Sequence, residues 1–330
     1  MGSNIYTHGS SASSHPLVPG IYVPTVAFFH PDESVDVVTT AAHVTRLAAT
    51  GIAGVVTHGS NGEAVHLDHD ERRLITETTR RALDAAGKTS VPVIVGCGAQ
   101  STWETVQLCH DAAASGGSHA LILPPAYYGS LIPTDLILDH FRAVADASPV
   151  PILIYNFPGA CAGVDLSSDV IIALAAHPNI VGVKLTCGNT GKLARVVSAT
   201  RTTGERRSEQ APFLTFGGSV DFTLQTLVVG GHGIIGGTAN LAPRTCTRLV
   251  SLWQQGTLGE ARELQATIAE GDWVAIQGGF PAVKAALNTY FGYGGKPRKP
   301  CVLVKGRELA RQLDGFKPLI EMELALEQRK

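Results

Sequence analysis

Charge is scarce in this chain of 330 residues, and neither sign dominates. Charged residues make up 16%, with 26 basic and 28 acidic side chains and a formal net charge of −2. A coiled coil needs more charge at its e and g positions, and a nucleic-acid-binding surface needs an excess of basic residues. No apolar run approaches the roughly 20 residues that span a bilayer. The composition therefore predicts neither a nucleic-acid partner nor a membrane partner.

Paired cysteines and ready-made catalytic loops are also missing. The six cysteines form no Cys-x-x-Cys pair, so we expect neither a zinc site nor a thioredoxin-like redox centre. Cysteines of this kind favour a reducing compartment and hence a cytoplasmic location. The full phosphate-binding loop that ends in Gly-Lys-Ser/Thr and the Gly-x-Ser-x-Gly elbow are absent as well. No His, Asp and Glu set has the character of metal ligands, so we expect no metal.

Apolar residues and glycine are abundant. Hydrophobic residues make up 44% of the chain, and glycine occupies 36 positions, which excludes disorder. Eight apolar runs recur along the chain, and most are aliphatic throughout rather than alternating. Such runs are typical of strands buried on both faces of a parallel sheet. The runs are 21–29, 51–58, 91–97, 119–124, 150–156, 180–186, 213–217 and 232–237.

Segments with helical periodicity separate the apolar runs, and signals of a helix N-terminus precede them. Ser101 and Glu104 have the spacing of a capping box, and acidic or hydroxyl side chains precede the other two clearest segments. Strict alternation of strand and helix predicts parallel β/α architecture, and eight units favour a closed barrel over an open sheet. The three segments are 72–86, 106–114 and 170–176.

These patterns divide the chain into three predicted parts. Only helical patterns remain after the eighth run. We therefore expect a disordered leader at 1–18, a (β/α)8 TIM barrel at 19–242 and a C-terminal helical extension at 243–330. In such a barrel the catalytic groups come from the C-terminal ends of the strands and from the loops that follow them.

A lysine, Lys184, lies within the otherwise apolar sixth run. Burying an ammonium group is unfavourable unless the group is paired or loses its proton. A neutral amine can attack a ketone and form a Schiff base. The alternative is a lysine at the end of the strand, whose amine reaches solvent or pairs with a carboxylate. The strand alone favours neither interpretation.

Two other strand ends carry polar groups that suit a keto acid. Tyr155 lies in the fifth run at the same relative height as Lys184, where a phenol can move protons to and from a carbinolamine. A core tyrosine is the alternative. The second run leads into Gly59-Ser-Asn-Gly-Glu63, whose amides and hydroxyl can bind an anion, although Asn-Gly is also a common turn. Glu63 is either an acid or base, or a structural carboxylate near a helix start.

Several short motifs occur together and in order, and the combination is more specific than any one of them. It resembles the dihydrodipicolinate synthase and N-acetylneuraminate lyase family of class I aldolases, over about residues 19–300. Within that family the chain most resembles the 4-hydroxy-2-oxoglutarate aldolase branch and fungal aldolases of 2-keto-3-deoxy sugar acids. The motifs are Gly59-Ser-Asn-Gly-Glu63, Tyr127-Tyr128, Tyr155-Asn156-x-Pro158, Val183-Lys184, Gly217-Gly218-Ser219 and Gly233-x-x-x-Gly237-Thr-Ala-Asn240.

The resemblance implies a set of catalytic groups. Lys184 matches the lysine that forms a Schiff base with pyruvate or another 2-keto acid. Tyr155 matches the tyrosine that relays protons, and Ser60 matches a hydroxyl that hydrogen-bonds to it. Tyr128 matches a tyrosine that a neighbouring subunit lends to this relay. The covalent imine on Lys184 replaces a cofactor, so neither a metal nor an organic cofactor is expected.

The resemblance also implies binding groups and an assembly. The amides of Ser60 and Asn61 match a cradle for the carboxylate of pyruvate, and Gly218 and Ile235 match residues that line the pocket. Members of the family are typically tetramers built from tight dimers, with a helical C-terminal extension. We therefore expect a cytoplasmic homotetramer, a dimer of dimers, with a small keto acid as its partner.

One segment departs from the family pattern. Dihydrodipicolinate synthases carry an arginine soon after the Tyr-Asn-x-Pro stretch, where it holds the carboxylate of aspartate semialdehyde. Residues 158–163 here read Pro-Gly-Ala-Cys-Ala-Gly, which cannot form a bidentate carboxylate clamp. We therefore predict an aldolase that cleaves a 2-keto-3-deoxy sugar acid or a 4-hydroxy-2-oxo acid to pyruvate and an aldehyde. Dihydrodipicolinate synthesis, a Schiff-base dehydratase and a non-catalytic binding protein are the alternatives.

Overall fold

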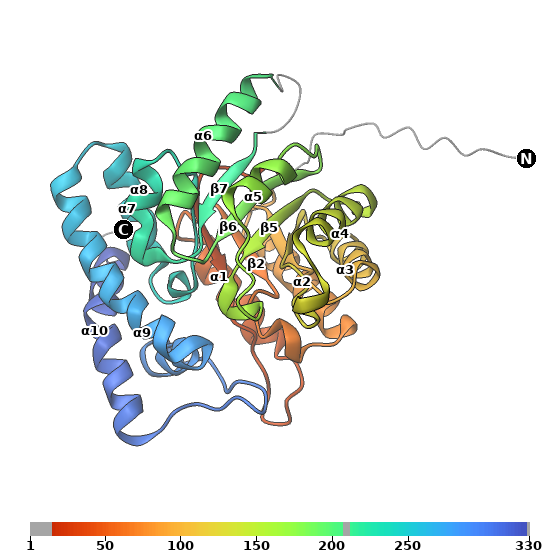
Figure 1. Cartoon of the computed structure of the whole chain (residues 1–330). Coiled ribbons are helices and arrows are strands. Elements are labelled where there is room, and N and C mark those ends of the chain that lie inside the picture. Colours follow the sequence, from red (N-terminus) through yellow and green to blue (C-terminus); the bar gives the residue numbers. More distant parts are fainter. Residues whose placement is uncertain (1–14, 207–211, 329–330) are drawn as a thin grey trace, which may run out of the picture.

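Eight parallel strands close into a barrel in the computed structural model, which describes residues 15–206 and 212–328 (Figure 1). The strands pair in chain order, and β8 pairs with β1 to close the ring. This confirms the predicted barrel. The strands are β1 (Gly20–Pro24), β2 (Gly54–Thr57), β3 (Val93–Gly96), β4 (His119–Ile122), β5 (Ile152–Asn156), β6 (Ile180–Leu185), β7 (Leu214–Gly217) and β8 (Gly233–Ile235).

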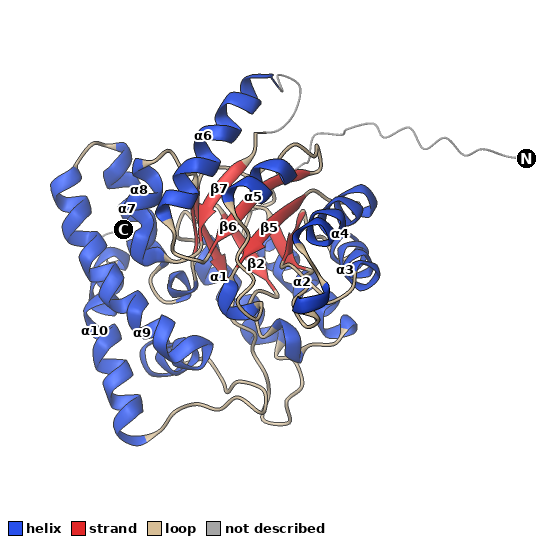
Figure 2. Ribbon diagram, viewed as in Figure 1, coloured by secondary structure: helices blue, strands red, loops and turns tan. Residues whose placement is uncertain are grey.

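Helices alternate with the strands and surround the barrel (Figure 2). The last two, α9 and α10, pack against each other to one side of it, at the blue end of the chain (Figure 1). The helices are α1 (Val37–Ala48), α2 (His69–Ala85), α3 (Thr102–Ala114), α4 (Thr134–Ala147), α5 (Ser168–Leu174), α6 (Thr190–Arg206), α7 (Thr223–Val228), α8 (Pro243–Gln254), α9 (Leu258–Phe291) and α10 (Gly306–Glu327).

Two apolar cores explain why the strands are apolar throughout. The inner core fills the barrel with side chains from every strand, among them the fully buried Tyr22, Leu153 and Phe216. The outer and larger core lies between the strands and the surrounding helices. Because both faces of each strand are covered, the strands need no polar alternation. The continuous apolar runs of the sequence follow from this arrangement.

The predicted helix starts are also present. Asp68, Ser101 and Ser167 are the N-caps of α2, α3 and α5, and each side chain accepts a hydrogen bond from the amide three residues later. Asp68 forms a full capping box with Glu71. These bonds fix where each helix begins and therefore where the preceding loop ends.

Three helices follow residue 242 in the described part of the chain. The first, α8, packs against β1 and completes the outer ring of the barrel, so that α9 and α10 lie beyond it. Helix α9 is broken at Gly279, where φ is 62° and ψ is −164°, two residues before Pro281. A proline lacks the amide that would continue the helical bonding pattern, which accounts for a kink at this point. The two halves of α9 can therefore face different parts of the barrel.

The predicted leader and the membrane-spanning potential of the helices are the remaining points of the fold. Residues 1–14 of the leader predicted for residues 1–18 lie outside the described residues, so the leader stays a prediction. Among residues 15–206 and 212–328, no helix has both the length and the apolar character needed to cross a bilayer.

Candidate active site

Lys184 and Tyr155 lie side by side on neighbouring strands. In the register of β5 and β6, Tyr155 pairs with Lys184, and the Nζ atom of Lys184 lies 4.1 Å from the centre of the Tyr155 ring. Both residues are only 3% exposed. They lie near the C-terminal ends of their strands, where barrel enzymes carry their catalytic groups.

A bulge in β6 sets this register. Ile152 pairs with Ile180, whereas the next residue of β5, Leu153, pairs with Gly182. β6 therefore has one extra residue at this point. Because successive side chains point to opposite faces of a strand, a shift of one residue exchanges the two faces. The bulge thereby places Lys184 on the same face as its tyrosine partner in β5, inside the barrel.

Among residues 15–206 and 212–328, the amine of Lys184 has no acidic partner. Its neighbour in β7 is Phe216, which is fully buried. Ion pairs hold Lys192 and Lys284, two other buried lysines, but across the described ranges none holds Lys184. An unpaired amine in an apolar site is the form of lysine that attacks a carbonyl carbon.

The turn after β2 leaves two backbone amides unused. Its own hydrogen bonds run from the Gly62 amide to the Gly59 carbonyl, at 3.0 Å, and from the Glu63 amide to the Ser60 carbonyl, at 3.3 Å. Within the described part of the chain, the amides of Ser60 and Asn61 donate no hydrogen bond. Adjacent free amides of this kind can bind an anion. The turn therefore fits the carboxylate cradle that the sequence predicts.

Glu63 has a structural role at the end of this turn. Its backbone is left-handed, with φ at 52°, and its side chain is completely buried. One carboxylate oxygen accepts a hydrogen bond from Lys284 Nζ, at 2.9 Å, and the other accepts one from the amide of Arg298, also at 2.9 Å. Of the two roles left open for Glu63, these bonds support the structural one. They anchor the turn to α9 and to the segment that follows it.

Two predicted relay groups, Ser60 and Tyr128, are exposed in the single chain. Ser60 is exposed, and Tyr128 is 60% exposed. The Tyr128 ring contacts the Tyr127 ring edge-to-face, with 5.0 Å between the ring centres. Among the residues described, no hydrogen bond or ring contact joins Ser60 or Tyr128 to Tyr155. An exposed tyrosine remains available to a second subunit, which is the role predicted for Tyr128.

Gly218 and Ile235 line different parts of the barrel. Ile235 is fully buried in the inner core that also contains Tyr155. A Cβ atom at Gly218 would lie 2.0 Å from the hydroxyl oxygen of Thr186, so only glycine fits there. Thr186 is not among the residues predicted from the sequence, although strand alternation places it on the same face as Lys184. Its hydroxyl is buried and has no hydrogen-bond partner in the described structure.

The loop after β5 supplies no positive charge. A short turn, η3 (Pro158–Ala160), leads to Cys161, which is buried. Burial raises the pKa of this thiol to about 11, so it is neutral at physiological pH. No other residue of the segment 158–163 can be charged.

No group of three or more His, Cys, Asp or Glu side chains within the described ranges could hold a metal ion.

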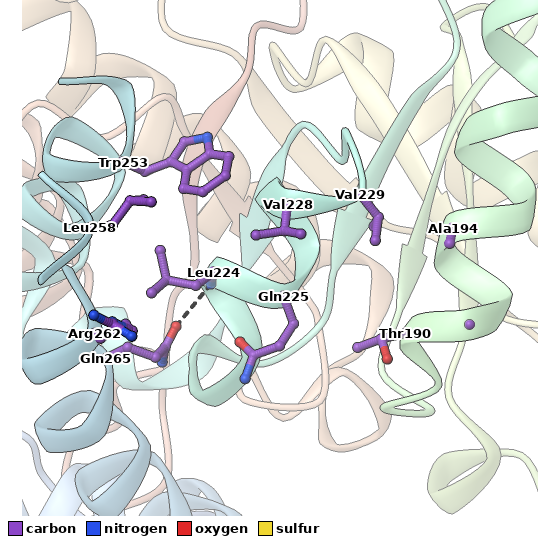
Figure 3. A pocket seen from close by; sticks show the side chains of 11 residues that line it. Thr190, Ala194, Leu224, Gln225, Val228, Val229, Trp253, Leu258, Arg262 and Gln265 are labelled. Carbon is purple, nitrogen blue, oxygen red and sulfur yellow. Dashed lines mark hydrogen bonds between the residues drawn. The ribbon is translucent and has the colours of Figure 1, made fainter. Parts of the chain in front are cut away.

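A wide apolar groove lies among the helices that surround the barrel (Figure 3). It has a volume of about 690 Å³ and is formed by α6, α7, α8 and α9. None of the predicted site residues lines it, so it is not the candidate active site. Its apolar side chains include Leu224, Val228, Trp253 and Leu258.

Known proteins are similar to this chain in sequence and in fold. Residues 17–312 match the dihydrodipicolinate synthetase family. A relative from Emericella nidulans, named a probable mitochondrial 4-hydroxy-2-oxoglutarate aldolase, is 59% identical over 96% of this chain and 99% of its own. An L-threo-3-deoxy-hexylosonate aldolase from Hypocrea jecorina is 47% identical, covering 94% and 99%. A crystal structure of a dihydrodipicolinate synthase family protein from Coccidioides immitis has a TM-score of 0.83, 30% identity, and coverage of 94% and 99%.

The cytoplasmic location predicted from the cysteines is wrong. The relative from Emericella nidulans is named mitochondrial, and so is a further relative from Coccidioides immitis. Unpaired cysteines argue against an oxidising compartment, but they do not distinguish between compartments that keep thiols reduced. The composition therefore carried no information on this choice.

Proposed function

Since the chain belongs to the dihydrodipicolinate synthetase family, we propose that it is a class I aldolase, which cleaves a 4-hydroxy-2-keto acid to pyruvate and an aldehyde. The observation that carries the proposal is the buried, unpaired amine of Lys184 beside the Tyr155 ring. An amine in this environment can attack the carbonyl carbon of a keto acid. Two relatives are named aldolases, which are carbon–carbon lyases.

The reaction begins at C2 of the keto acid. The neutral amine of Lys184 adds to the C2 carbonyl, and the carbinolamine loses water to form an iminium. Tyr155 supplies and recovers the protons of these steps. The Tyr155 oxygen then takes the proton of the C4 hydroxyl, the C3–C4 bond breaks, and its electron pair passes into the iminium to give an enamine. Protonation at C3 and hydrolysis release pyruvate and regenerate Lys184.

Other groups of the site bind the keto acid during these steps. The free amides of Ser60 and Asn61 support a carboxylate cradle at one end of the substrate. The unpartnered hydroxyl of Thr186 is available to a substrate oxygen, and Gly218 keeps the adjacent loop close to it. The imine on Lys184 is the electron sink, so the proposed mechanism uses neither a metal nor an organic cofactor.

The far end of the substrate decides between the candidate acids. The relatives are named for 4-hydroxy-2-oxoglutarate and for L-threo-3-deoxy-hexylosonate. The absence of a cation at 158–163 supports a neutral, hydroxylated end such as that of a sugar acid. The same absence disfavours aspartate semialdehyde, and with it dihydrodipicolinate synthesis.

We further propose a homotetramer arranged as a dimer of dimers. The loop after β4 exposes large apolar side chains to solvent, with Tyr127 at 80%, Tyr128 at 60% and Leu131 at 70%. The outer groove exposes more (Figure 3). Monomeric proteins rarely expose large contiguous apolar patches. Light scattering measures the assembly, and Tyr128→Ala is expected to lower kcat because Tyr128 completes the relay of a neighbouring subunit.

Borohydride reduction in the presence of pyruvate tests the proposed chemistry. We expect irreversible inactivation and a covalent adduct on the peptide that contains Lys184. Lys184→Met gives no adduct, whereas the matched control Lys192→Met, which changes a buried but paired lysine, keeps it. If no adduct forms on Lys184 of the wild type, the proposal fails.

A panel of keto acids then identifies the reaction. Release of pyruvate together with an aldehyde, from a 3-deoxy sugar acid or from 4-hydroxy-2-oxoglutarate, is the expected result. Loss of water without cleavage of a carbon–carbon bond would identify a dehydratase. Condensation of pyruvate with aspartate semialdehyde would identify a dihydrodipicolinate synthase.

A further inference from the structure

A buried carboxylate in α9 joins two loops at the mouth of the candidate site. Asp272 is only 2% exposed. One of its oxygens accepts hydrogen bonds from the Ser219 hydroxyl, at 2.5 Å, and from the Asp221 amide, at 3.0 Å. The other oxygen accepts one from the Thr238 hydroxyl. Ser219 and Asp221 follow β7, and Thr238 follows β8, so one side chain from outside the barrel holds both loops.

Each of these loops packs closely against a residue of the candidate site. In the loop after β7, a Cβ atom at Gly218 would lie 2.0 Å from the hydroxyl oxygen of Thr186. In the loop after β8, a Cβ atom at Gly237 would lie 2.7 Å from the side-chain nitrogen of Asn61. The loops are therefore in close contact with the carboxylate cradle and with the free hydroxyl near Lys184. A small displacement of either loop changes the shape of the binding site.

Helix α9 presents a row of polar side chains to these loops. Gln265 lies two turns before Asp272 and on the same face of the helix. Its side-chain oxygen accepts a hydrogen bond from the Leu224 amide (Figure 3), and its side-chain nitrogen donates one to the Val220 carbonyl. Burial raises the pKa of Asp272, and the hydrogen bonds from Ser219 and Thr238 oppose that rise. The Asp221 amide can only donate, so the Asp272 oxygen that it contacts acts as an acceptor.

We propose that Asp272 is a positioning residue for the keto acid, because it fixes the loops after β7 and β8 against Thr186 and Asn61. This inference rests on the proposed aldolase function. Asp272 does not touch the reacting atoms, and the strand register holds Lys184 in place without it. Loss of the carboxylate therefore weakens substrate binding more than it slows the chemical step.

A matched control lies in α10. Glu323 is 1% exposed and also accepts three hydrogen bonds, from the amides of Arg244 and Thr245 and from the Thr245 hydroxyl. Its donors lie at the start of α8 rather than in the loops of the site. Glu323→Gln and Asp272→Asn thus both replace a buried carboxylate with an amide, although Glu323 also lies 3.7 Å from the guanidinium of Arg244. Only Asp272→Asn loosens the site.

Steady-state kinetics and thermal unfolding of the two variants test the inference. Asp272→Asn is expected to raise the KM for the keto acid roughly tenfold, with a much smaller change in kcat, because misplaced binding groups cost affinity. The adduct on Lys184 still forms at saturating pyruvate. Glu323→Gln keeps its KM within about twofold of the wild type, even if its Tm falls by as much as that of Asp272→Asn. An unchanged KM in Asp272→Asn, or an equal rise in both variants, overturns the inference.

A second pair of variants covers the case in which Asp272→Asn does not fold. Thr238→Val removes one hydrogen bond to Asp272 and is expected to raise the KM, whereas Thr238→Ser keeps the hydroxyl and the wild-type KM. Equal KM values for these two variants argue against the inference. A wild-type protein that releases no pyruvate from any keto acid refutes the proposed function instead, which is a separate outcome.

Discussion

Two buried lysines of this protein face aromatic rings, yet only one of them has a counter-charge among the described residues. The Nζ atom of Lys184 lies 4.1 Å from the centre of the Tyr155 ring, and that of Lys284 lies 4.9 Å from the centre of the Phe29 ring. Lys284 pairs with Glu63 at 2.9 Å, whereas the described residues offer Lys184 no such partner. Burial and an aromatic neighbour are common to both lysines, so the difference between them is pairing.

Pairing separates a candidate nucleophile from a structural ion pair. An amine attacks a carbonyl only through a free lone pair, and at Lys284 a buried carboxylate favours the protonated form. Burial lowers the pKa of Lys284, but the charge of Glu63 opposes that shift. Among the described residues, no carboxylate pairs with the amine of Lys184. A buried polar group without a partner destabilises the fold, and the catalytic role that we propose for Lys184 would explain why such a group is present.

Replacing Lys184 with methionine is expected to have the largest effect on turnover of any change at these lysines. Methionine keeps an unbranched side chain of similar length and removes only the unpaired amine, so the fold loses no ion pair. Turnover is expected to fall by on the order of 10⁴-fold or more, as for other essential covalent groups, while the Tm stays equal to or above that of the wild type. Pyruvate release and a thermal melt measure the two. Substantial residual turnover would assign the chemistry to another residue.

Replacing Lys284 with methionine is expected to give the opposite pattern. The change leaves the Glu63 carboxylate buried without its partner, which costs about 3–5 kcal/mol of unfolding free energy. Urea denaturation measures that loss. Where the variant is folded, pyruvate and borohydride should still label Lys184. A free energy of unfolding close to that of the wild type would mean that the ion pair is not structural.

Local sequence patterns were sufficient to predict the barrel, because burial on both faces of a strand and N-caps of helices are local signals. The same signals could not show where β1 ends. Val26 and Phe28 continue the apolar run beyond Pro24, but they pack with side chains of α9 and α10. An apolar residue that packs inside the barrel and one that packs against α9 and α10 give the same signal in the sequence.

The site could be predicted only in part. Lys184 and Tyr155 stand out because a polar group within an apolar strand is a local signal. The partners of Glu63 and the contacts of Asp272 left no such signal, since Lys284 is 221 residues away from Glu63 in the sequence. The bulge in β6 was equally hidden, because one extra apolar residue leaves a continuous apolar run unchanged.

Changing both partners of the buried ion pair measures how strongly Glu63 and Lys284 stabilise each other. Neutral replacement of a whole buried pair destabilises less than removal of one partner, because no charge is left alone. The double variant Glu63→Gln with Lys284→Met should therefore be more stable than the sum of the single changes predicts, by about 1–3 kcal/mol. Urea denaturation of the four proteins gives this coupling energy. Additive losses would show that the two side chains do not stabilise each other.

Lys192→Met is expected to have the smallest effect, because the counter-charge of Lys192 is exposed. The side chain of Lys192 is 5% exposed, but that of its partner Asp165 is 45% exposed, so water can solvate the carboxylate when the pair is broken. The expected loss of unfolding free energy is therefore about 1 kcal/mol or less, with unchanged turnover. Urea denaturation of Lys192→Met and of Lys284→Met compares the loss of unfolding free energy at two lysines of similar burial. A larger loss for Lys284→Met shows that burial of the counter-charge decides the cost, whereas equal losses would assign it to burial of the amine.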